Sequence, residues 1–212
     1  MKGSPIAAVL CAPGTNRDSD VSFALTQAGA TPISYLMSDL ISQPSRIDDA
    51  DIIVIAGGFS YADALGAGRL FAVELENSIG DRIGAAIAER RPVIGICNGF
   101  QTLVRMGILP EDNRLVALGH NDGGVFDCRW IEMEPVSKKC IWTRNLTENI
   151  HCPIAHGEGR LTAGSSTVSA LVKNDQVALR YVNRNPNGSV GDIAGICDPT
   201  GVVLGLMPHP EN

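Results

Sequence analysis

The sequence has no long apolar run and no cluster of basic residues, and each absence excludes a class of function. No window approaches the roughly 20 apolar residues of a membrane-spanning helix. The apolar stretch near the N-terminus is broken at Pro13-Gly14, too early for a secretion signal. The formal net charge of -6 argues against nucleic acid or an anionic membrane as a partner. We therefore expect a cytoplasmic protein.

Cysteine pairs are also lacking, since none of the six cysteines belongs to a Cys-x-x-Cys motif. His151, Cys152 and His156 could supply only part of a zinc site, which needs four ligands with recognisable spacing. We therefore predict no metal. A chain of 212 residues can bury a core without disulfides. We expect reduced cysteines and one domain spanning residues 1–212.

Strand and helix patterns alternate in the first half of the chain. Apolar runs predict buried strands at residues 6–10, 52–55 and 92–96. Helical spacing follows them, at residues 18–28, 68–90 and 98–107. Asp18 or Asp20 is the expected cap of the first helix, and Gly29 its end. The alternation is typical of right-handed β-α-β units around a parallel sheet.

The second half reads as strands separated by turn clusters, with little helix between them. The predicted strands lie within residues 125–134, 176–182, 192–198 and 201–209. The predicted fold class is therefore α/β, with a mostly parallel sheet flanked by helices and a β-rich C-terminal half.

Cys97 stands between two glycines in the segment GICNG, after a predicted strand and before a predicted helix. Gly95 and Gly99 give it the Gly-x-nucleophile-x-Gly spacing of a nucleophile elbow. At a helix N-terminus, unpaired N–H groups and the positive dipole end favour a thiolate. Cys97 is thus a candidate nucleophile. The alternative is a packed cysteine whose glycine neighbours permit close strand–helix contact.

A nucleophilic cysteine needs an oriented base, and His209 is the first candidate. It follows an apolar strand, at the edge where parallel sheets carry their chemistry. Glu211 lies two residues on, and positions i and i+2 of an extended chain face the same side. The alternative for His209 is a structural rim histidine. His156, in AHGEGR, is the second candidate base.

Backbone N–H groups must stabilise the oxyanion of an acyl-transfer intermediate. The Asn98 N–H directly follows the nucleophile, and the Gly57-Gly58 loop follows the preceding strand. Loss of one donor would lower the rate by about 100- to 1,000-fold. An ordinary turn is the alternative for the two glycines.

The elbow and the distant His-x-Glu resemble class I glutamine amidotransferases. More narrowly, several segments resemble the glutaminase subunits of phosphoribosylformylglycinamidine synthase: GICNGFQ, GGFSYAD, PIAHGEGR, NPNGS and GLMPHPE. The match runs from the APGTNRDSD loop to the C-terminus. It implies a flavodoxin-like amidotransferase fold and a role in purine biosynthesis.

The resemblance implies roles for individual residues. Cys97 would attack the side-chain amide of glutamine, His209 would be the base and acid, and Glu211 would orient His209. It also implies that Gly58 and Asn98 form the oxyanion hole. The glutamine pocket would be lined by Gln101, Asn121 and Phe126.

The resemblance further implies a partner. Ammonia would pass through a protected channel to a synthase subunit that binds ATP and Mg²⁺. A small accessory subunit could join the complex, and this chain would hold no cofactor. Ala62 and the LGAG run resemble forms fused to a large synthase, whereas Phe100 matches the separate subunit. Because the family continues past the His-x-Glu motif, we expect the native chain to extend beyond Asn212.

Two other functions stay open at this point. A stand-alone cysteine hydrolase or peptidase of the same fold would use His156 as its base. A non-catalytic interaction or stress-response protein would keep the elbow as a relic, and an electrophilic glutamine analogue would leave its Cys97 unmodified. Alanine replacement of each histidine separates the first alternative from a glutaminase.

Overall fold

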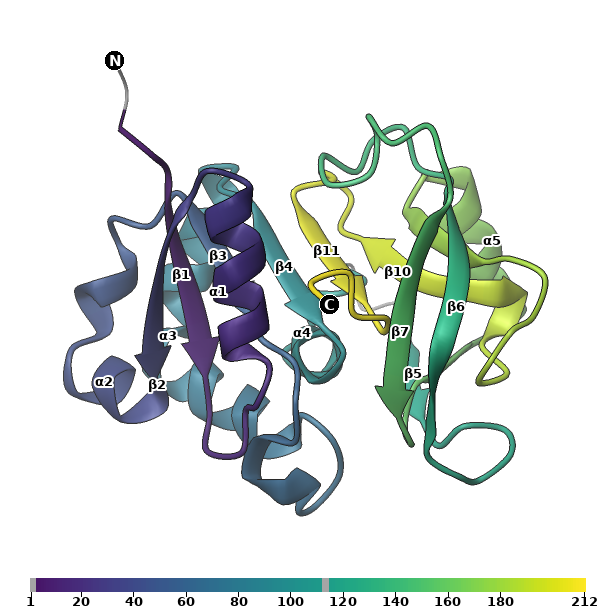
Figure 1. The fold of residues 1–212 in the computed structure, drawn as a ribbon, viewed down its shortest axis with the longest axis horizontal. Helices are drawn as coiled ribbons and strands as arrows, with labels where there is room; N and C mark the ends of the chain where they lie inside the picture. The colour runs from purple at the N-terminus through teal and green to yellow at the C-terminus, as the bar shows by residue number, and fades with distance from the viewer. Residues whose placement is uncertain (1–2, 112–114) are drawn as a thin grey trace.

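The computed structural model describes residues 3–111 and 115–212. Within them, a nine-stranded sheet has the order β2-β1-β3-β4-β11-β10-β9-β6-β7. Figure 1 shows α1 on one face of its first part, with α3 and α4 on the other. No helix in the described ranges is long and apolar enough to cross a membrane.

The first five strands in this order pair in parallel, as the alternating pattern predicts. They are β2 (Thr31–Leu36), β1 (Ile6–Cys11), β3 (Ile52–Ile55), β4 (Val93–Ile96) and β11 (Val203–Leu206). The central strands β3, β4 and β11 are almost continuously apolar, because both of their faces are largely buried. The carboxyl ends of these three neighbours therefore share one edge of the sheet.

The helices are α1 (Asp18–Gln27), α2 (Met37–Ser42), α3 (Arg69–Ala88), α4 (Asn98–Arg105) and α5 (Ser165–Lys173). Short 3-10 turns cover Pro44–Ile47, Ser60–Asp63 and Val190–Asp192. In α3, a buried apolar row includes Phe71, Leu75, Ile79 and Ile83. The glycines at 80 and 84 do not interrupt this helix, because its packed face outweighs their weak helix propensity.

The predicted cap of α1 is wrong. The N-cap residue is Arg17, and no side chain caps the helix. Asp18 and Asp20 both lie inside the helix, in its first turn, and Asp20 forms an ion pair with Arg17 at 3.1 Å. Gly29 ends the helix with a left-handed φ of +87°, as predicted.

The C-terminal half supplies antiparallel strands: β10 (Ile193–Cys197), β9 (Val177–Tyr181), β6 (Asp127–Pro135) and β7 (Ile150–His156). A separate antiparallel pair joins β5 (Val116–Gly119) to β8 (Arg160–Ala163). The sequence patterns predict neither the strands β2, β5, β7 and β8 nor the helices α2 and α5. The segment HCPIAH, weighed above as a metal cluster, forms most of β7.

Strand β7, at the end of the sheet order, contacts the segment that follows β11. Beyond β11, the His209 N–H donates to the Pro153 carbonyl of β7 at 2.9 Å. The Ala155 carbonyl of β7 lies 4.0 Å from Cys97 Sγ. The antiparallel half thus forms a wall of the site at the carboxyl ends of β3, β4 and β11.

Candidate active site

Cys97 occupies a strained turn between β4 and α4. Its φ of 51° and ψ of -104° lie outside the usual regions for a non-glycine residue. Such a conformation costs about 1–3 kcal/mol and needs support from its surroundings. The turn places the thiol at the first turn of α4, where backbone N–H groups have no partner within the helix.

The flanking glycines permit this turn because neither has room for a side chain. A Cβ atom on Gly99 would lie 2.0 Å from the Ile55 carbonyl oxygen of β3. One on Gly95 would lie 2.5 Å from the Gly99 carbonyl oxygen. The elbow therefore depends on close contact between α4 and the sheet.

His209 and Glu211 follow β11 and lie beside the elbow. His209 Nδ1 is 2.7 Å from Glu211 Oε1, and both side chains are buried. A Cβ atom on Gly57 would lie 3.0 Å from His209 Cε1 and 3.5 Å from Cys97 Cβ. The imidazole and the thiol, distant in sequence, are thus neighbours across Gly57.

The environment of His209 favours its protonated form. Burial of the ring opposes protonation, but hydrogen bonds with Cys97 and Glu211 and the charges of these groups outweigh it. Together they raise the pKa of His209 to about 10. Because Glu211 contacts Nδ1, Nε2 is the nitrogen left for the thiol.

Two backbone N–H groups are available near the nucleophile. Asn98 is the first residue of α4, so its N–H is free for a ligand. Gly58 forms an isolated antiparallel bridge with Thr15. The hydrogen bond of this bridge runs from the Phe59 N–H to the Gly14 carbonyl, so it does not use the Gly58 N–H. In the described part of the chain, the Gly58 N–H has no hydrogen-bond acceptor. Both expected oxyanion donors are therefore unpaired.

The Asn98 side chain connects α4 to the strap formed by residues 60–63. Its Oδ1 accepts from the Ser60 hydroxyl, and its Nδ2 donates to Asp63 Oδ1 at 2.9 Å. Tyr61, Ala62 and Asp63 all have positive φ, although none is glycine. The strap is strained, and these bonds stabilise it against the helix.

A cleft of about 240 Å³ opens beside Cys97 and is the natural place for a small substrate. Phe59 and Phe126 form a tilted ring pair at the cleft, with centroids 6.2 Å apart. Asp63 and Glu158 add carboxylates. Burial raises the pKa of Asp63, and the charge of Glu158 adds to this effect, partly offset by the bond from Asn98.

Gln101 lines the cleft as expected, and its amide is already bonded. Nε2 donates to the Glu158 carbonyl at 2.5 Å, and Oε1 accepts from Asn98 Nδ2 at 3.3 Å. The side chain thereby joins α4 to the turn after β7. Direct contact between Gln101 and a substrate stays a prediction.

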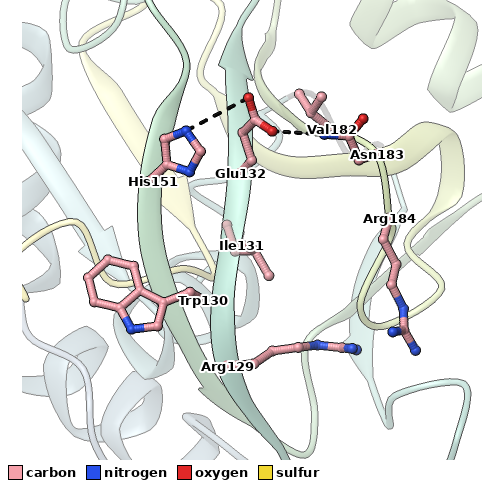
Figure 2. A pocket seen from close by; sticks show the side chains of 8 residues that line it. All are labelled: Arg129, Trp130, Ile131, Glu132, His151, Val182, Asn183 and Arg184. Carbon is pink, nitrogen blue, oxygen red and sulfur yellow. Dashed lines mark hydrogen bonds and ion pairs between the residues drawn. The ribbon is translucent and has the colours of Figure 1, made fainter.

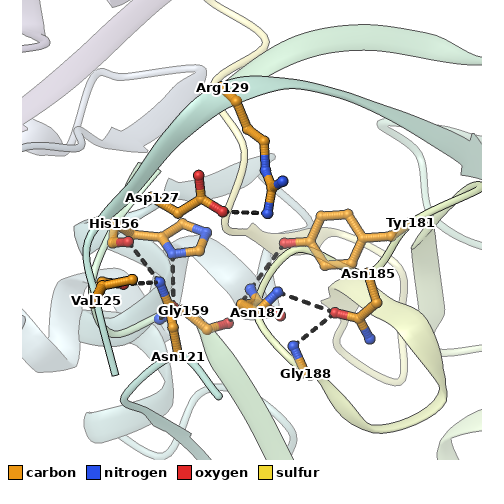
Figure 3. A network of polar contacts seen from close by, with 10 residues as sticks. All are labelled: Asn121, Val125, Asp127, Arg129, His156, Gly159, Tyr181, Asn185, Asn187 and Gly188. Atoms are coloured by element: carbon orange, nitrogen blue, oxygen red, sulfur yellow. Dashed lines mark hydrogen bonds and ion pairs between the residues drawn. The ribbon is translucent and has the colours of Figure 1, made fainter. Parts of the chain in front are cut away.

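Asn121 lies outside the cleft lining, at the centre of a buried network (Figure 3). Nδ2 donates to the carbonyls of Val125 and His156 at 2.9 and 2.8 Å. Oδ1 accepts from the Gly159 N–H and contacts His156 Nδ1, both at 3.1 Å. All its hydrogen-bonding capacity is used, so Asn121 supports the cleft walls around Phe126 and His156.

His156 is buried in the same network and lines the cleft. Because both Asn121 Nδ2 protons go to carbonyls, His156 Nδ1 must carry the proton donated to Asn121 Oδ1, and Nε2 is the unprotonated nitrogen. Burial lowers the pKa of His156 to about 4, with the nearby His209 acting in the same direction. The ring is therefore neutral near pH 7.

A second pocket, of about 270 Å³, lies on the antiparallel half away from Cys97 (Figure 2). Glu132 lies at one end of this pocket and contacts His151 at 3.8 Å and Asn183 at 2.8 Å. Arg129 and Arg184 lie at its other end. No nucleophile adjoins it among the residues that the structure describes, so the candidate chemistry belongs to the cleft at Cys97.

Sequence reasoning missed two residues near the site. Asp63 stands in the quoted segment GGFSYAD, so that motif was a usable signal. Tyr181 lies in an ordinary strand pattern that gives no such signal. In the described residues, no group of three or more His, Cys, Asp or Glu side chains suits a metal ion. The absence of a cofactor stays a prediction.

Comparison with known proteins gives a consistent family relationship. The CobB/CobQ-like glutamine amidotransferase domain matches residues 4–212. The Treponema denticola protein named phosphoribosylformylglycinamidine synthase subunit PurQ is 48% identical, over 98% of this chain and 88% of that protein. A protein of the same name from Nostoc is 40% identical, over 96% of this chain and 86% of that protein.

Solved structures agree with this result. A chain in the structure of PurLQS from Thermotoga maritima has a TM-score of 0.82 and 35% identity, over 98% of this chain and 88% of that chain. A glutamine amidotransferase from Thermotoga maritima has a TM-score of 0.62 at 14% identity, over 99% of this chain and 77% of that one. The second similarity concerns the fold alone.

Proposed function

The chain belongs to the CobB/CobQ-like glutamine amidotransferase domain family, and on that premise we propose that it is the glutaminase subunit of a phosphoribosylformylglycinamidine synthase. The observation that carries this proposal is the contact of Cys97, His209 and Glu211 at one sheet edge, in a chain 48% identical to a protein of that name. We treat residues 1–212 as a single amidotransferase domain.

In the first half of the reaction, the Cys97 proton passes to His209, and the resulting thiolate attacks the amide carbon of glutamine. The N–H groups of Asn98 and Gly58 donate to the oxyanion that develops. The intermediate collapses as His209 returns the proton to the leaving nitrogen. The C–N bond breaks, ammonia departs, and a glutamyl thioester remains on Cys97.

In the second half, His209 takes a proton from water, whose oxygen attacks the thioester carbon. Collapse of the second tetrahedral intermediate breaks the C–S bond, releases glutamate and returns the proton to Cys97. The net reaction is glutamine plus water to glutamate plus ammonia. Glu211 stabilises the imidazolium throughout and fixes the ring orientation.

The cleft favours an amino acid substrate with a neutral side-chain amide. Phe126 and Phe59 offer apolar contact for its methylene groups, and Asp63 and Glu158 offer carboxylates for an α-ammonium group. Gln101 positions the Glu158 turn through its bond to the Glu158 carbonyl. Asn121 acts indirectly, through the walls that it bonds.

Ammonia formed here passes to a synthase subunit that binds ATP and Mg²⁺ and converts formylglycinamide ribonucleotide to the amidine. Protonated ammonia has no lone pair for attack, which is the chemical reason for keeping donor and acceptor sites joined. We place this assembly in the cytoplasm. A small accessory subunit is a further partner to be sought in the purified complex.

The test measures glutamate release and amidine formation with and without the synthase, for wild type and Cys97→Ala. We expect the variant to lose glutamine-driven synthesis by about four orders of magnitude, because the nucleophile is gone. Added ammonia should still support product formation. Glutamine use by the variant, or failure of ammonia to rescue it, would refute the role of Cys97.

A further inference from the structure

The interior beside the elbow contains buried polar groups that the proposed chemistry does not use. His156 and Tyr181 are 3% and 5% exposed. Asp127, the cross-strand partner of His156, and Arg129, on the same face of β6, form an ion pair whose two side chains are partly exposed. Figure 3 shows the Tyr181 hydroxyl and the His156 ring pointing toward one another, with Arg129 beside them.

Two of these groups have hydrogen-bonding capacity left over. Among residues 3–111 and 115–212, His156 Nε2 and Arg129 Nε have no hydrogen-bond partner although both atoms are buried. Native proteins rarely leave such atoms unpaired, because burial without a partner costs free energy. The Tyr181 hydroxyl accepts from Asn187 Nδ2 at 3.3 Å and keeps its own proton to donate.

The network fixes the directions of these groups. Gly159 packs against the His156 ring, since a Cβ atom there would lie 2.3 Å from the ring carbon Cε1. Asn187 Nδ2 also donates to the Gly159 carbonyl at 2.8 Å, which joins the Tyr181 side to the His156 side. The acceptor and the donor are therefore preorganised.

A ligand for these groups must be small, accept from Tyr181 and donate to His156 Nε2. Neutral ammonia does both, because it has one lone pair and three N–H bonds. Ammonium has no lone pair and therefore cannot accept a hydrogen bond from Tyr181. Burial raises the pKa of Tyr181, which keeps its hydroxyl protonated as a donor.

The position of these groups connects them to the source of ammonia. His156 lines the cleft that contains Cys97, and the carbonyl of Ala155, the residue before it on β7, lies 4.0 Å from Cys97 Sγ. Building on the proposed glutaminase activity, we propose that His156 Nε2 and the Tyr181 hydroxyl form a holding site for neutral ammonia released at Cys97.

The test uses the whole synthase complex and counts glutamate released per amidine formed, while a second enzyme traps ammonia that escapes. Tyr181→Phe removes only the hydroxyl and keeps the ring in the core. His156→Leu removes the acceptor, whereas His156→Gln restores an acceptor oxygen. Tyr35→Phe, on β2 at the opposite end of the sheet, is the matched control.

Loss of one hydrogen bond weakens retention of a small ligand by about fivefold. We therefore expect Tyr181→Phe and His156→Leu to raise the glutamate-to-amidine ratio and the trapped ammonia. His156→Gln should give a smaller rise, and Tyr35→Phe none. Synthesis from excess added ammonia should be unchanged.

An unchanged ratio in Tyr181→Phe would overturn the proposal, even if His156→Leu failed to fold. A parallel fall of glutamate release and amidine formation in Tyr181→Phe, whose side chain does not line the cleft, would also overturn it, because that result means a purely structural role. A wild type that releases no glutamate with the synthase present would instead refute the proposed function.

Discussion

The two buried histidines lie in different halves of the molecule and have opposite protonation states. Burial disfavours the charged form of both rings. His209, at the edge of the parallel sheet, contacts Glu211 and Cys97, and its pKa is raised to about 10. His156, in the antiparallel half, contacts the neutral amide of Asn121, and its pKa is lowered to about 4.

The comparison shows that partners, rather than depth of burial, decide what a buried imidazole can do. A ring beside a carboxylate and a thiol can exchange protons during catalysis. A ring bonded to an amide is kept neutral and can only accept or donate hydrogen bonds. The cysteine hydrolase alternative needs His156 as a base, and the geometry favours His209 instead.

The sharpest test of this contrast replaces each histidine by alanine and measures kcat/KM for glutamine in the synthase complex. His209→Ala should lower it by about 10⁴-fold, because the proton acceptor of the nucleophile is lost. His156→Ala should lower it by no more than about 100-fold, because that ring supports the cleft without taking the thiol proton. The reverse ranking would restore the hydrolase alternative.

In the parallel half, one substitution in the elbow around Cys97 can disrupt the packing of α4 on the sheet. Gly99→Ala places a methyl group 2.0 Å from the Ile55 carbonyl oxygen, so β3 and α4 must separate. We expect the free energy of unfolding to fall by about 3 kcal/mol or more, measured by urea denaturation. Gly84→Ala is the control. Gly84 lies in α3 with nothing near its added methyl, so this change should stabilise the protein by about 0.5–1 kcal/mol.

In the antiparallel half, substitution of Asn121 can disrupt the buried hydrogen-bond network. Asn121→Ala leaves two carbonyls, the Gly159 N–H and His156 Nδ1 without their partner. We expect a loss of about 2–3 kcal/mol in urea denaturation, because buried polar groups left unpaired are costly. Asn77→Ala, which removes an exposed bond within α3, should change stability by less than about 0.5 kcal/mol. Equal effects of the two changes would contradict the central role of Asn121.

The dependence of stability on pH gives a further test of the contrast between the two histidines. The raised pKa of His209 means that its contribution is complete below about pH 6.5 and is lost as pH rises toward about 10. The lowered pKa of His156 means that its contribution is complete above about pH 6.5 and is lost as pH falls toward about 4.

Urea denaturation across this pH range, in wild type and in each histidine-to-glutamine variant, checks both signs. His209→Gln should flatten the alkaline side of the profile and His156→Gln the acidic side. A variant that flattens the wrong side would contradict the assigned protonation state.

The sequence predicts the parallel half well because its signals are local. The glycines around Cys97 and the His-x-Glu spacing depend on a few adjacent residues. The predicted cap of α1 is wrong, because Asp18 and Asp20 both lie inside the helix, in its first turn. The strand β7 was missed since its residues suggested metal ligands, and α5 because the surrounding turns suggested only strands.

The network around Asn121 could not be predicted, because its members come from distant segments and none has a distinctive motif spacing. Asn121, His156 and Asn187 meet only when β7 pairs with β6 and the turn after β9 folds over them. The resemblance drew attention to Asn121 as a pocket residue. Its saturated amide could be recognised only from coordinates.

The bond from the His209 N–H to the Pro153 carbonyl has a consequence for biosynthesis of the chain. Residue 97 leaves the ribosome about 6–20 s before residue 209, at translation rates of about 5–20 residues per second. During that interval the thiol has no imidazole beside it. If Cys97 and His209 have the roles proposed above, a nascent polypeptide gains its reactivity toward glutamine only after residue 209 docks on β7.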